Sequence, residues 1–293
     1  MPSTSLERGL KVIHSRLVYL YEKYPPSDYV WAVYYSGGKD STCLLLNIKM
    51  FAEKKGFIPI IVHNDTGVEL PALAKLTRKV LSTAKEWGFD VKVFKHNKGF
   101  FNLMLEKGYS FPVWYKRWCC RTLKYGLTRS WERDNNVLAL LALRGDETRR
   151  LRSRNFINRD KYRVTAFPLI DVNKEWVWDF LERYCPWIAE LKSLYPKGVE
   201  RLGCWVCTVI SEDKALKLLD PELYEMKVAL VRARCMSIEL FLELLKRFKR
   251  KRPDAFEDYD PGLLKEVKLP SCKGKACSKC RLVVWKNKKL CLF

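Results

Sequence analysis

The chain has 293 residues, of which 48% are hydrophobic and 30% are charged, and this composition excludes a disordered or collagen-like protein. The longest apolar runs, such as residues 137–143, are far shorter than the ~20 residues that span a bilayer, and the N-terminus has no apolar signal region. We therefore expect a cytoplasmic protein without a membrane partner. Lys and Arg outnumber Asp and Glu by 55 to 33, and the absence of Gln fits a thermophile. Thermal adaptation adds charges of both signs, so the net charge of +22 favours a nucleic-acid partner, the alternative being a nucleotide alone.

Helices and strands alternate through the first half of the chain. Residues 6–24 have apolar positions at helical spacing, and two prolines follow at once. We expect strands over residues 29–35, 57–62, 90–94 and 137–143, and helices over residues 40–55 and 70–87. This alternation predicts an α/β fold with a mainly parallel, doubly wound, Rossmann-like sheet that binds ligands at the carboxyl ends of its strands.

The C-terminal part of the chain is basic. An amphipathic helix over residues 238–249 runs into residues 246–252, of which six in seven are basic, and residues 265–289 contain nine basic residues and one acid. Both runs favour a nucleic-acid surface, and a solvated charged face is the alternative. We expect an N-terminal helix (residues 1–27), a nucleotide-binding domain (28–214) and a helical, basic extension with a Cys-rich tail (215–293).

A glycine-containing loop joins the first expected strand to the next helix. It reads Ser36-Gly37-Gly38-Lys39-Asp40-Ser41. The glycines allow a close approach of an anion, the helix N-terminus directs N–H groups at it, and Lys39 adds a positive charge. The loop is therefore expected to bind nucleotide phosphates, although it is not a Walker A loop.

The 11 cysteines divide into three sets. Cys43, Cys185 and Cys235 stand alone in apolar or helical stretches, and we expect buried, structural side chains there. A second set consists of the adjacent pair Cys119–Cys120 and the motif Cys204-x-x-Cys207, and a third consists of Cys272, Cys277, Cys280 and Cys291. Clustered cysteines in a cytoplasmic protein point to metal ligands or redox groups more than to disulfides.

Six segments in order resemble a known family. The loop Ser36–Ser41 is similar to the PP-loop of the N-type ATP pyrophosphatases. The other five segments narrow the resemblance to the branch that resembles phosphoadenylyl-sulfate (PAPS) reductases. They are residues 64–67 (NDTG), 118–124 (WCCRTLK), 144–148 (RGDET), 167–172 (FPLIDV) and 201–207 (RLGCWVC).

The resemblance implies roles for individual residues. Ser36, Gly37, Gly38, Lys39, Asp40 and Ser41 would hold the phosphates of ATP, PAPS or adenylyl sulfate, and Lys39, Asp40 and Ser41 would be the catalytic residues. Asp65 and Thr66 would lie beside the adenosine, and Arg144 would belong to the nucleotide site. Family members often continue as Arg-x-x-Glu-Ser-x-x-Arg. Here Thr148 replaces the serine, and Arg149, Arg150 and Arg152 do not keep that spacing.

The cysteine pair and the Cys-x-x-Cys motif resemble the [4Fe–4S] site of adenylyl-sulfate reductases. Thiolates are soft donors that suit such clusters, and a structural zinc site usually draws on two Cys-x-x-Cys knuckles instead of an adjacent pair. We therefore expect Cys119, Cys120, Cys204 and Cys207 to be iron–sulfur ligands. The tail set begins with the spacing of plant-type ferredoxins, so Zn²⁺ and a second cluster both stay open there.

Two enzymes and one binding module fit these features. The first is a sulfurtransferase that adenylates its substrate with ATP and Mg²⁺, releases pyrophosphate and then inserts sulfur. The intact SGGKDS loop favours it, and residues 203–214 resemble the PAPS-reductase-like subunit of DNA phosphorothioation systems. The alternative is a reductase that releases sulfite from PAPS or adenylyl sulfate, although such enzymes carry a C-terminal Glu-Cys-Gly motif that this chain lacks. The third is a non-catalytic module that senses nucleotides and binds nucleic acid.

Several partners follow from the sulfurtransferase interpretation. We expect an adenine nucleotide, tRNA or DNA, and a protein that donates sulfur or electrons. A homodimer stays open.

Overall fold

A computed structural model describes residues 3–107, 111–112, 117–147, 155–208, 213–234 and 238–262, together with a short antiparallel hairpin of β7 (Val283–Trp285) and β8 (Lys288–Leu290). The chain forms two compact units. The sheet unit comprises residues 1–64, 73–94 and 127–195, and the cysteine unit comprises residues 65–72, 95–126 and 196–293. Since a compact unit need not fold alone, the expected domain limits at residues 27 and 214 stay predictions.

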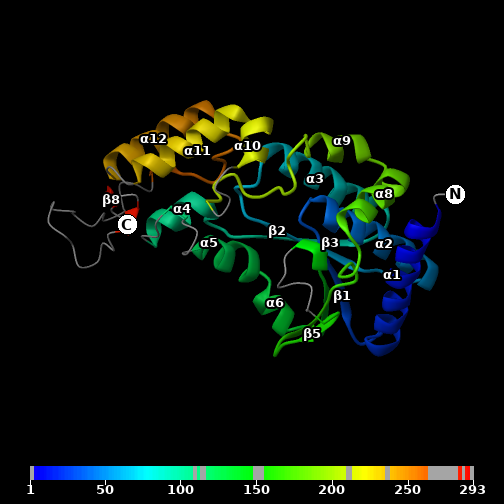
Figure 1. The fold of residues 1–293 in the computed structure, drawn as a ribbon. Coiled ribbons are helices and arrows are strands. Elements are labelled where there is room, and N and C mark those ends of the chain that lie inside the picture. The colour runs from blue at the N-terminus through cyan, green and yellow to red at the C-terminus, as the bar shows by residue number, and fades with distance from the viewer. Residues whose placement is uncertain are drawn as a thin grey trace. The chain divides into compact units, whose positions relative to one another are not determined.

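A six-stranded sheet forms the centre of the sheet unit, with the strand order β3-β2-β1-β4-β6-β5 (Figure 1). Its strands are β1 (Val30–Tyr34), β2 (Ile60–Asp65), β3 (Asp90–Lys95), β4 (Val137–Leu140), β5 (Ile157–Arg159) and β6 (Arg163–Ala166). β1 is parallel to β2 and to β4, β4 is parallel to β6, and β5 pairs antiparallel with β6. The prediction of a mainly parallel α/β sheet is confirmed.

The position predicted for the second strand was wrong by three residues. We expected it at residues 57–62, whereas β2 begins at Ile60, which pairs with Ala32 of β1. Phe57 instead packs its ring against Trp31, with 5.0 Å between ring centroids, and Ile58 is 64% exposed. The strand continues through polar residues to Asp65. Its pairing with β1, and not its content of apolar residues, sets its register.

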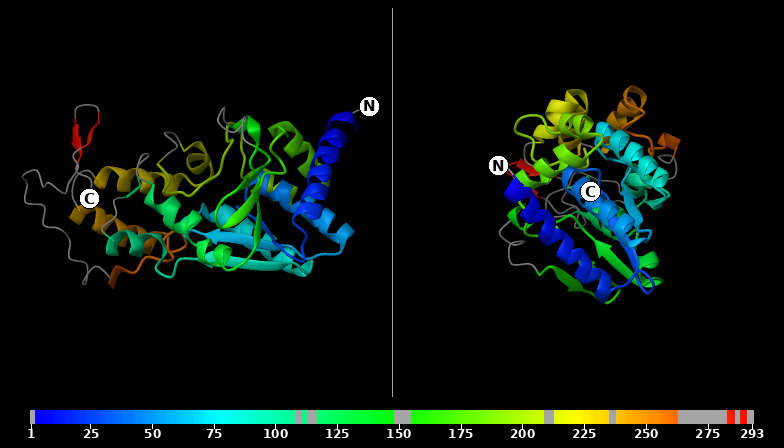
Figure 2. Two further views of the ribbon diagram at one scale, coloured as in Figure 1. Left: turned by 90° about the horizontal axis from the view of Figure 1, so that it is seen from below. Right: turned by 90° about the vertical axis from the view of Figure 1, so that its right-hand side faces the viewer.

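Three helices form a layer against the sheet. These are α1 (Ser3–Lys23), α2 (Lys39–Lys55) and α8 (Lys174–Tyr184), which contact one another (Figures 1 and 2). A Cβ atom at Gly9 of α1 would lie 2.1 Å from the indole nitrogen of Trp176, so glycine is what allows α1 and α8 to approach. The same indole donates a hydrogen bond to the carbonyl of Leu6 at 3.2 Å. This layer holds α2, and with it the glycine-containing loop, against β1.

The remaining helices are divided between the two units. The sheet unit also contains most of α3 (Pro71–Glu86), α6 (Arg129–Arg133), a 3-10 turn (Gly145–Glu147) and α9 (Ile188–Ser193). The cysteine unit contains α4 (Gly99–Glu106), α5 (Trp118–Cys120), a π-helical turn (Arg121–Tyr125), α10 (Lys214–Leu219), α11 (Pro221–Ala233) and α12 (Ile238–Lys251). α11 and α12 lie side by side in both Figure 1 and Figure 2. The amphipathic helix expected over residues 238–249 is confirmed as α12.

Aromatic side chains make the core of the cysteine unit. Phe101 stacks on Phe256 with 4.9 Å between ring centroids, and Trp205 lies 5.1 Å from Phe256. These three side chains are at most 1% exposed. The segment after α12 is therefore part of the same core as the Cys204–Cys207 loop. None of the helices in the described ranges is long and apolar enough to cross a bilayer.

Candidate functional site

The loop Ser36–Ser41 follows β1 and leads into α2, and its two glycines have different reasons to be there. Gly37 has a φ of +80°, and a Cβ atom there would lie 2.2 Å from the hydroxyl of Thr77. Gly38 has an ordinary extended backbone, with φ −81° and ψ 169°, and caps α2. A Cβ atom at Gly38 would lie 3.2 Å from the hydroxyl of Tyr195. Gly37 thus permits the backbone conformation of the loop, and Gly38 leaves room for the Tyr195 hydroxyl close to it.

The two serines of the loop are hydrogen-bonded within it. The Ser36 N–H and hydroxyl both donate to the Ser41 Oγ, at 3.2 and 3.1 Å, and the Ser41 hydroxyl donates to the carbonyl of Gly38 at 3.0 Å. These bonds preorganise the loop at the N-terminus of α2, where the partial positive charge of the helix lies.

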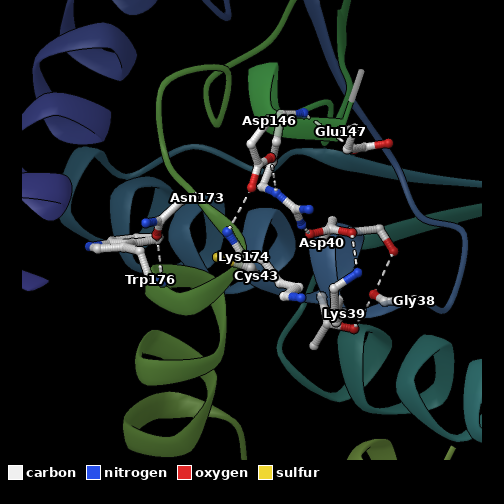
Figure 3. A network of polar contacts seen from close by, with 12 residues as sticks. Gly38, Lys39, Asp40, Cys43, Asp146, Glu147, Asn173, Lys174 and Trp176 are labelled. Atoms are coloured by element: carbon white, nitrogen blue, oxygen red, sulfur yellow. Dashed lines mark hydrogen bonds and ion pairs between the residues drawn. The ribbon is translucent and has the colours of Figure 1, made fainter. Parts of the chain in front are cut away.

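Two buried cations share one carboxylate of this loop. The ammonium of Lys39 lies 3.0 Å from Asp40 Oδ2 (Figure 3). Arg144 pairs with the other oxygen of Asp40. Arg144 also pairs with Asp146 through its Nε at 2.9 Å. The side chains of Lys39 and Arg144 are each 5% exposed, whereas Asp40 is 21% and Asp146 35% exposed. The site therefore holds two buried positive charges that are balanced by two more accessible carboxylates.

The strand-following turn positions Arg144. The chain leaves β4 and enters the 3-10 turn, where the Gly145 N–H donates to the carbonyl of Ile170 at 2.7 Å. The carboxylate of Asp146 accepts a hydrogen bond from the backbone N–H of Lys174, the first residue of α8, at 3.0 Å. The residues expected after it, Thr148, Arg149, Arg150 and Arg152, lie outside the described residues.

Tyr195 is a residue of this site that the sequence analysis missed. Its hydroxyl accepts a hydrogen bond from the Lys39 N–H at 3.1 Å, and its ring lies 5.2 Å from the Lys39 ammonium. Trp178 of α8 contacts the ring edge-on at 5.3 Å. Burial raises the pKa of Tyr195 to about 12, so it keeps its proton at neutral pH. No motif marked this tyrosine, because it lies 156 residues from Lys39 in the chain.

Asp65 and Thr66 belong to the cysteine unit. Asp65 accepts a hydrogen bond from the Gly67 N–H at 2.8 Å, and its second oxygen lies 3.6 Å from the Lys95 ammonium. Thr66 donates from its N–H and its hydroxyl to Glu69, at 2.8 and 2.6 Å, and its Oγ1 lies 3.5 Å from the sulfur of Cys204. This loop therefore contacts one of the predicted iron–sulfur ligands.

The four predicted ligand cysteines come from two segments of the cysteine unit. Cys119 and Cys120 are in α5, beside the π-helical turn, and their thiols are hydrogen-bonded to each other. Cys204 and Cys207 form a turn, with the Cys207 N–H donating to the Cys204 carbonyl at 2.9 Å. The Trp205 N–H donates to the Val68 carbonyl at 2.9 Å, which ties this turn to the Thr66 loop. All four thiols are reduced.

Lys124 interacts electrostatically with three of these cysteines. The charge of Cys204 is the largest influence that raises the pKa of Lys124 above its usual range, and Cys120, Glu69 and Cys207 act in the same direction. The hydrogen bond from Cys119 lowers the pKa of the Cys120 thiol, and Lys124 assists. Burial raises the pKa of the Cys204 thiol, and Lys124 acts against this rise. Lys124 therefore favours the thiolate form of Cys120 and Cys204.

The chemistry of the four cysteines suits an iron–sulfur cluster. Thiolates are soft donors, and a [4Fe–4S] cluster takes one of them on each of its four irons. The two cysteine pairs, with the half-buried Lys124 near them, supply that number of donors. Among the described residues, no three His, Cys, Asp or Glu side chains lie close enough together to hold one metal ion. Cys272, Cys277, Cys280 and Cys291 lie outside the described residues.

The solitary cysteines behave as expected where they are described. Cys43 is 0% and Cys185 6% exposed, and burial raises the pKa of both thiols. Both are therefore structural, and Cys235 lies outside the described residues.

A glycine-rich loop between a central parallel strand and the next helix defines the class of doubly wound α/β proteins that bind ligands at the carboxyl ends of their strands. Within this class, the phosphoadenosine phosphosulfate reductase domain model matches residues 31–210. This match covers more than half of the chain, and the protein therefore belongs to that family.

Two proteins of Methanocaldococcus jannaschii are similar in sequence. The uncharacterized protein MJ0066 is 27% identical over 203 residues, and the uncharacterized protein MJ0973 is 24% identical over 213 residues. These alignments cover 66% and 70% of this chain but only 39% and 48% of the two relatives. The chain thus spans less than half the length of either relative.

Several solved structures superpose on this chain. The NMN synthetase of Francisella tularensis superposes with a TM-score of 0.50 at 11% identity, covering 86% of this chain and 97% of that one. The PAPS reductase of Candida auris gives 0.48 at 16% identity, covering 71% and 98%. The U34-tRNA thiolase NcsA of Methanococcus maripaludis, solved with its [4Fe–4S] cluster, gives 0.45 at 11% identity, covering 92% and 84%.

Proposed function

We propose that this protein is an ATP-dependent sulfurtransferase that adenylates its acceptor, releases pyrophosphate and acts on nucleic acid. The observation that carries the proposal is the pair of buried cations, Lys39 and Arg144, that share Asp40 at the N-terminus of α2. Buried positive charge beside a glycine loop is suited to the phosphates of a nucleotide.

The carboxylates of this site fit Mg²⁺. Asp40 and Asp146 supply hard oxygen donors, and Mg²⁺ is commonly held by one or two carboxylates together with substrate phosphates. Bound there, Mg²⁺ would neutralise charge that develops on the phosphates. Asp40 and Asp146 would hold the ion, and Lys39 and Arg144 would bind phosphate oxygens.

The first step is transfer of the adenylyl group. An oxygen of the acceptor attacks the α-phosphorus of ATP, and a new P–O bond forms as the bond to the oxygen that bridges the α- and β-phosphates breaks. Pyrophosphate leaves with that electron pair. Lys39, Arg144 and the N–H groups of the loop stabilise the negative charge on the departing group.

The second step replaces the activated oxygen with sulfur. Hydrosulfide attacks the acceptor atom that carries the AMP group, the bond from that atom to the AMP oxygen breaks, and AMP leaves with the electron pair. The proton of hydrosulfide passes to solvent. Adenylation makes this possible because AMP is a far better leaving group than an oxide or hydroxide.

Cys119, Cys120, Cys204 and Cys207 would hold the [4Fe–4S] cluster. When bound, such a cluster would supply electrons, because four cysteine ligands occupy all four irons and leave none open for a sulfur ligand. The chain's own contribution is to present two pairs of thiols, and Lys124 favours ionisation of Cys120 and Cys204.

The charge distribution supports a nucleic-acid acceptor. It also limits the cations of the basic run that are available to contact that acceptor. In the basic run of residues 246–252, Lys249 donates to the carbonyls of Phe256 and Glu257, Arg252 pairs with Asp220 and Asp254, and Lys251 pairs with Glu222. The other three cations, Lys246, Arg247 and Arg250, are exposed. These three residues of α12 are the ones proposed to contact phosphates.

The decisive experiment supplies ATP to anaerobically reconstituted protein. We expect ATP to be converted to AMP and pyrophosphate when the acceptor nucleic acid is present. Sulfite released from PAPS without any ATP turnover would contradict the proposal. Binding of DNA or RNA without either reaction would instead identify a nucleotide-sensing module.

A sulfonucleotide reductase is the second candidate. The family to which the chain belongs favours it, since that family is named for PAPS reductase. The same buried cations would then hold the phosphates of PAPS or adenylyl sulfate, and the assay for sulfite distinguishes the two reactions.

A further inference from the structure

Tyr195 occupies an unusual place at the glycine loop. Its hydroxyl accepts the N–H of Lys39, the first residue of α2, which is one of the donors that a helix N-terminus offers to an anion. A side chain at position 38 would contact this hydroxyl, because a Cβ atom there would lie 3.2 Å from the Tyr195 oxygen. Since the backbone of Gly38 is ordinary, what glycine contributes here is room for the hydroxyl close to the loop.

The surroundings of the hydroxyl are cationic. The Lys39 ammonium lies 5.2 Å from the centroid of the ring, and the charge of Arg144 also acts on Tyr195. Having accepted the Lys39 N–H, the hydroxyl still has a proton to donate, and it donates to no group in the described part of the chain. A neighbourhood of one N–H and two cations suits an anionic acceptor.

We infer that Tyr195 is a phosphate-binding residue of the glycine loop, whose hydroxyl accepts the Lys39 N–H and donates to a phosphate oxygen of the nucleotide. This assignment rests on the proposed function, because it takes the loop to be a phosphate site. The hydroxyl then links the Lys39 N–H, at the positive end of α2, to the phosphate through two hydrogen bonds. The ring keeps the Lys39 ammonium in place through a cation–π contact.

Two features hold Tyr195 in position and keep its hydroxyl protonated, as donation to a phosphate requires. Trp178 packs edge-on against the ring, and the Tyr195 N–H donates to the carbonyl of Lys192 at 2.9 Å, so both the ring and its backbone are held. Burial raises the pKa of Tyr195 to about 12, so the phenol remains a donor across the neutral range.

The test measures the binding of inorganic pyrophosphate, ATP and adenosine by calorimetry to the full chain and to Tyr195→Phe. We expect the substitution to weaken pyrophosphate and ATP about tenfold, because a hydrogen bond to a charged group is lost. Adenosine affinity should not change, since adenosine has no phosphate. Tyr162→Phe is the matched control, because Tyr162 is 44% exposed in the same unit, and we expect it to bind all three as the wild type does.

The possible results separate this assignment from the proposed function. Equal pyrophosphate binding by wild type and Tyr195→Phe would overturn the assignment and leave the loop a phosphate site. Tighter binding by Tyr195→Phe would also overturn it, by showing that the hydroxyl competes with phosphate for the Lys39 N–H. A folded wild-type protein that binds neither pyrophosphate nor ATP would overturn the proposed function together with the assignment.

Discussion

Asp40 is the shared counter-ion of Lys39 and Arg144 in the proposed phosphate site, and replacing it with Asn tests that role. The substitution keeps the shape of the side chain and removes its charge, which leaves the buried ammonium of Lys39 and the buried guanidinium of Arg144 without their shared partner. At the 3.0 Å separation of Lys39 and Asp40, one pair is worth about 5 kcal/mol at an effective dielectric constant of about 20. Desolvation of the charges offsets much of this attraction.

The expected loss of stability is therefore smaller than the Coulomb energy. Removing one partner of a buried pair costs about 3–5 kcal/mol, and the 21% exposure of Asp40 places this case at about 3 kcal/mol. For a chain of this size, that loss lowers the melting temperature by about 6 °C. Arg144 keeps its second partner, Asp146, so the variant should still fold.

The assay is thermal unfolding of wild type and Asp40→Asn, with and without excess pyrophosphate and with no Mg²⁺ present. We expect pyrophosphate to stabilise the variant more than the wild type, because the anion replaces the missing counter-charge without having to displace a carboxylate. ATP turnover with Mg²⁺ should fall in the same variant, since a proposed ligand of the ion is lost.

The control and the refuting result are both simple. Asp179→Asn changes an exposed carboxylate of α8, and we expect it to leave both the melting temperature and its response to pyrophosphate unchanged. If pyrophosphate stabilises Asp40→Asn and wild type equally, then Asp40 does not compete with the anion, and the reasoning is wrong.

Three further predictions concern the remaining parts of the site. Lys39→Ala should abolish conversion of ATP to AMP and pyrophosphate but leave the iron–sulfur absorbance intact, and loss of both would show that Lys39 is needed for folding. Cys204→Ser should lower the iron content of anaerobically reconstituted protein, whereas Cys185→Ala should keep it, and equal iron in both variants would remove Cys204 from the ligand set. Nucleic-acid binding should weaken steeply with salt, and replacing the three exposed cations of α12 with Ala should reduce the slope of log K against log salt by about 2–3. The control for the last experiment is the triple variant Lys11→Ala, Lys54→Ala, Lys85→Ala, which changes exposed lysines of the sheet unit. A slope unchanged by the α12 variant would exclude that surface.

Local patterns in the sequence were sufficient for the parallel sheet, the loop between β1 and α2, and α12. Each depends on neighbours within a few residues: apolar runs for strands, two glycines before a helix, and helical spacing of apolar residues. The start of β2 was missed because the register of a strand is set by its partner in the sheet. Phe57 and Ile58 are apolar enough for a strand, but the pairing of Ile60 with Ala32 begins the strand later.

The sequence by itself determined which residue types surround the phosphate loop, but only the tertiary structure decided how they pair. Lys39, Asp40 and Arg144 were all expected at the nucleotide site, yet the sharing of Asp40 by two buried cations arises from contacts across 104 residues of chain. Tyr195 was not expected at all, because a tyrosine before a proline carries no local signal of its position. It reaches the Lys39 N–H only because α8 and α9 place it at the N-terminus of α2, and such a long-range approach cannot be read from spacing along the chain.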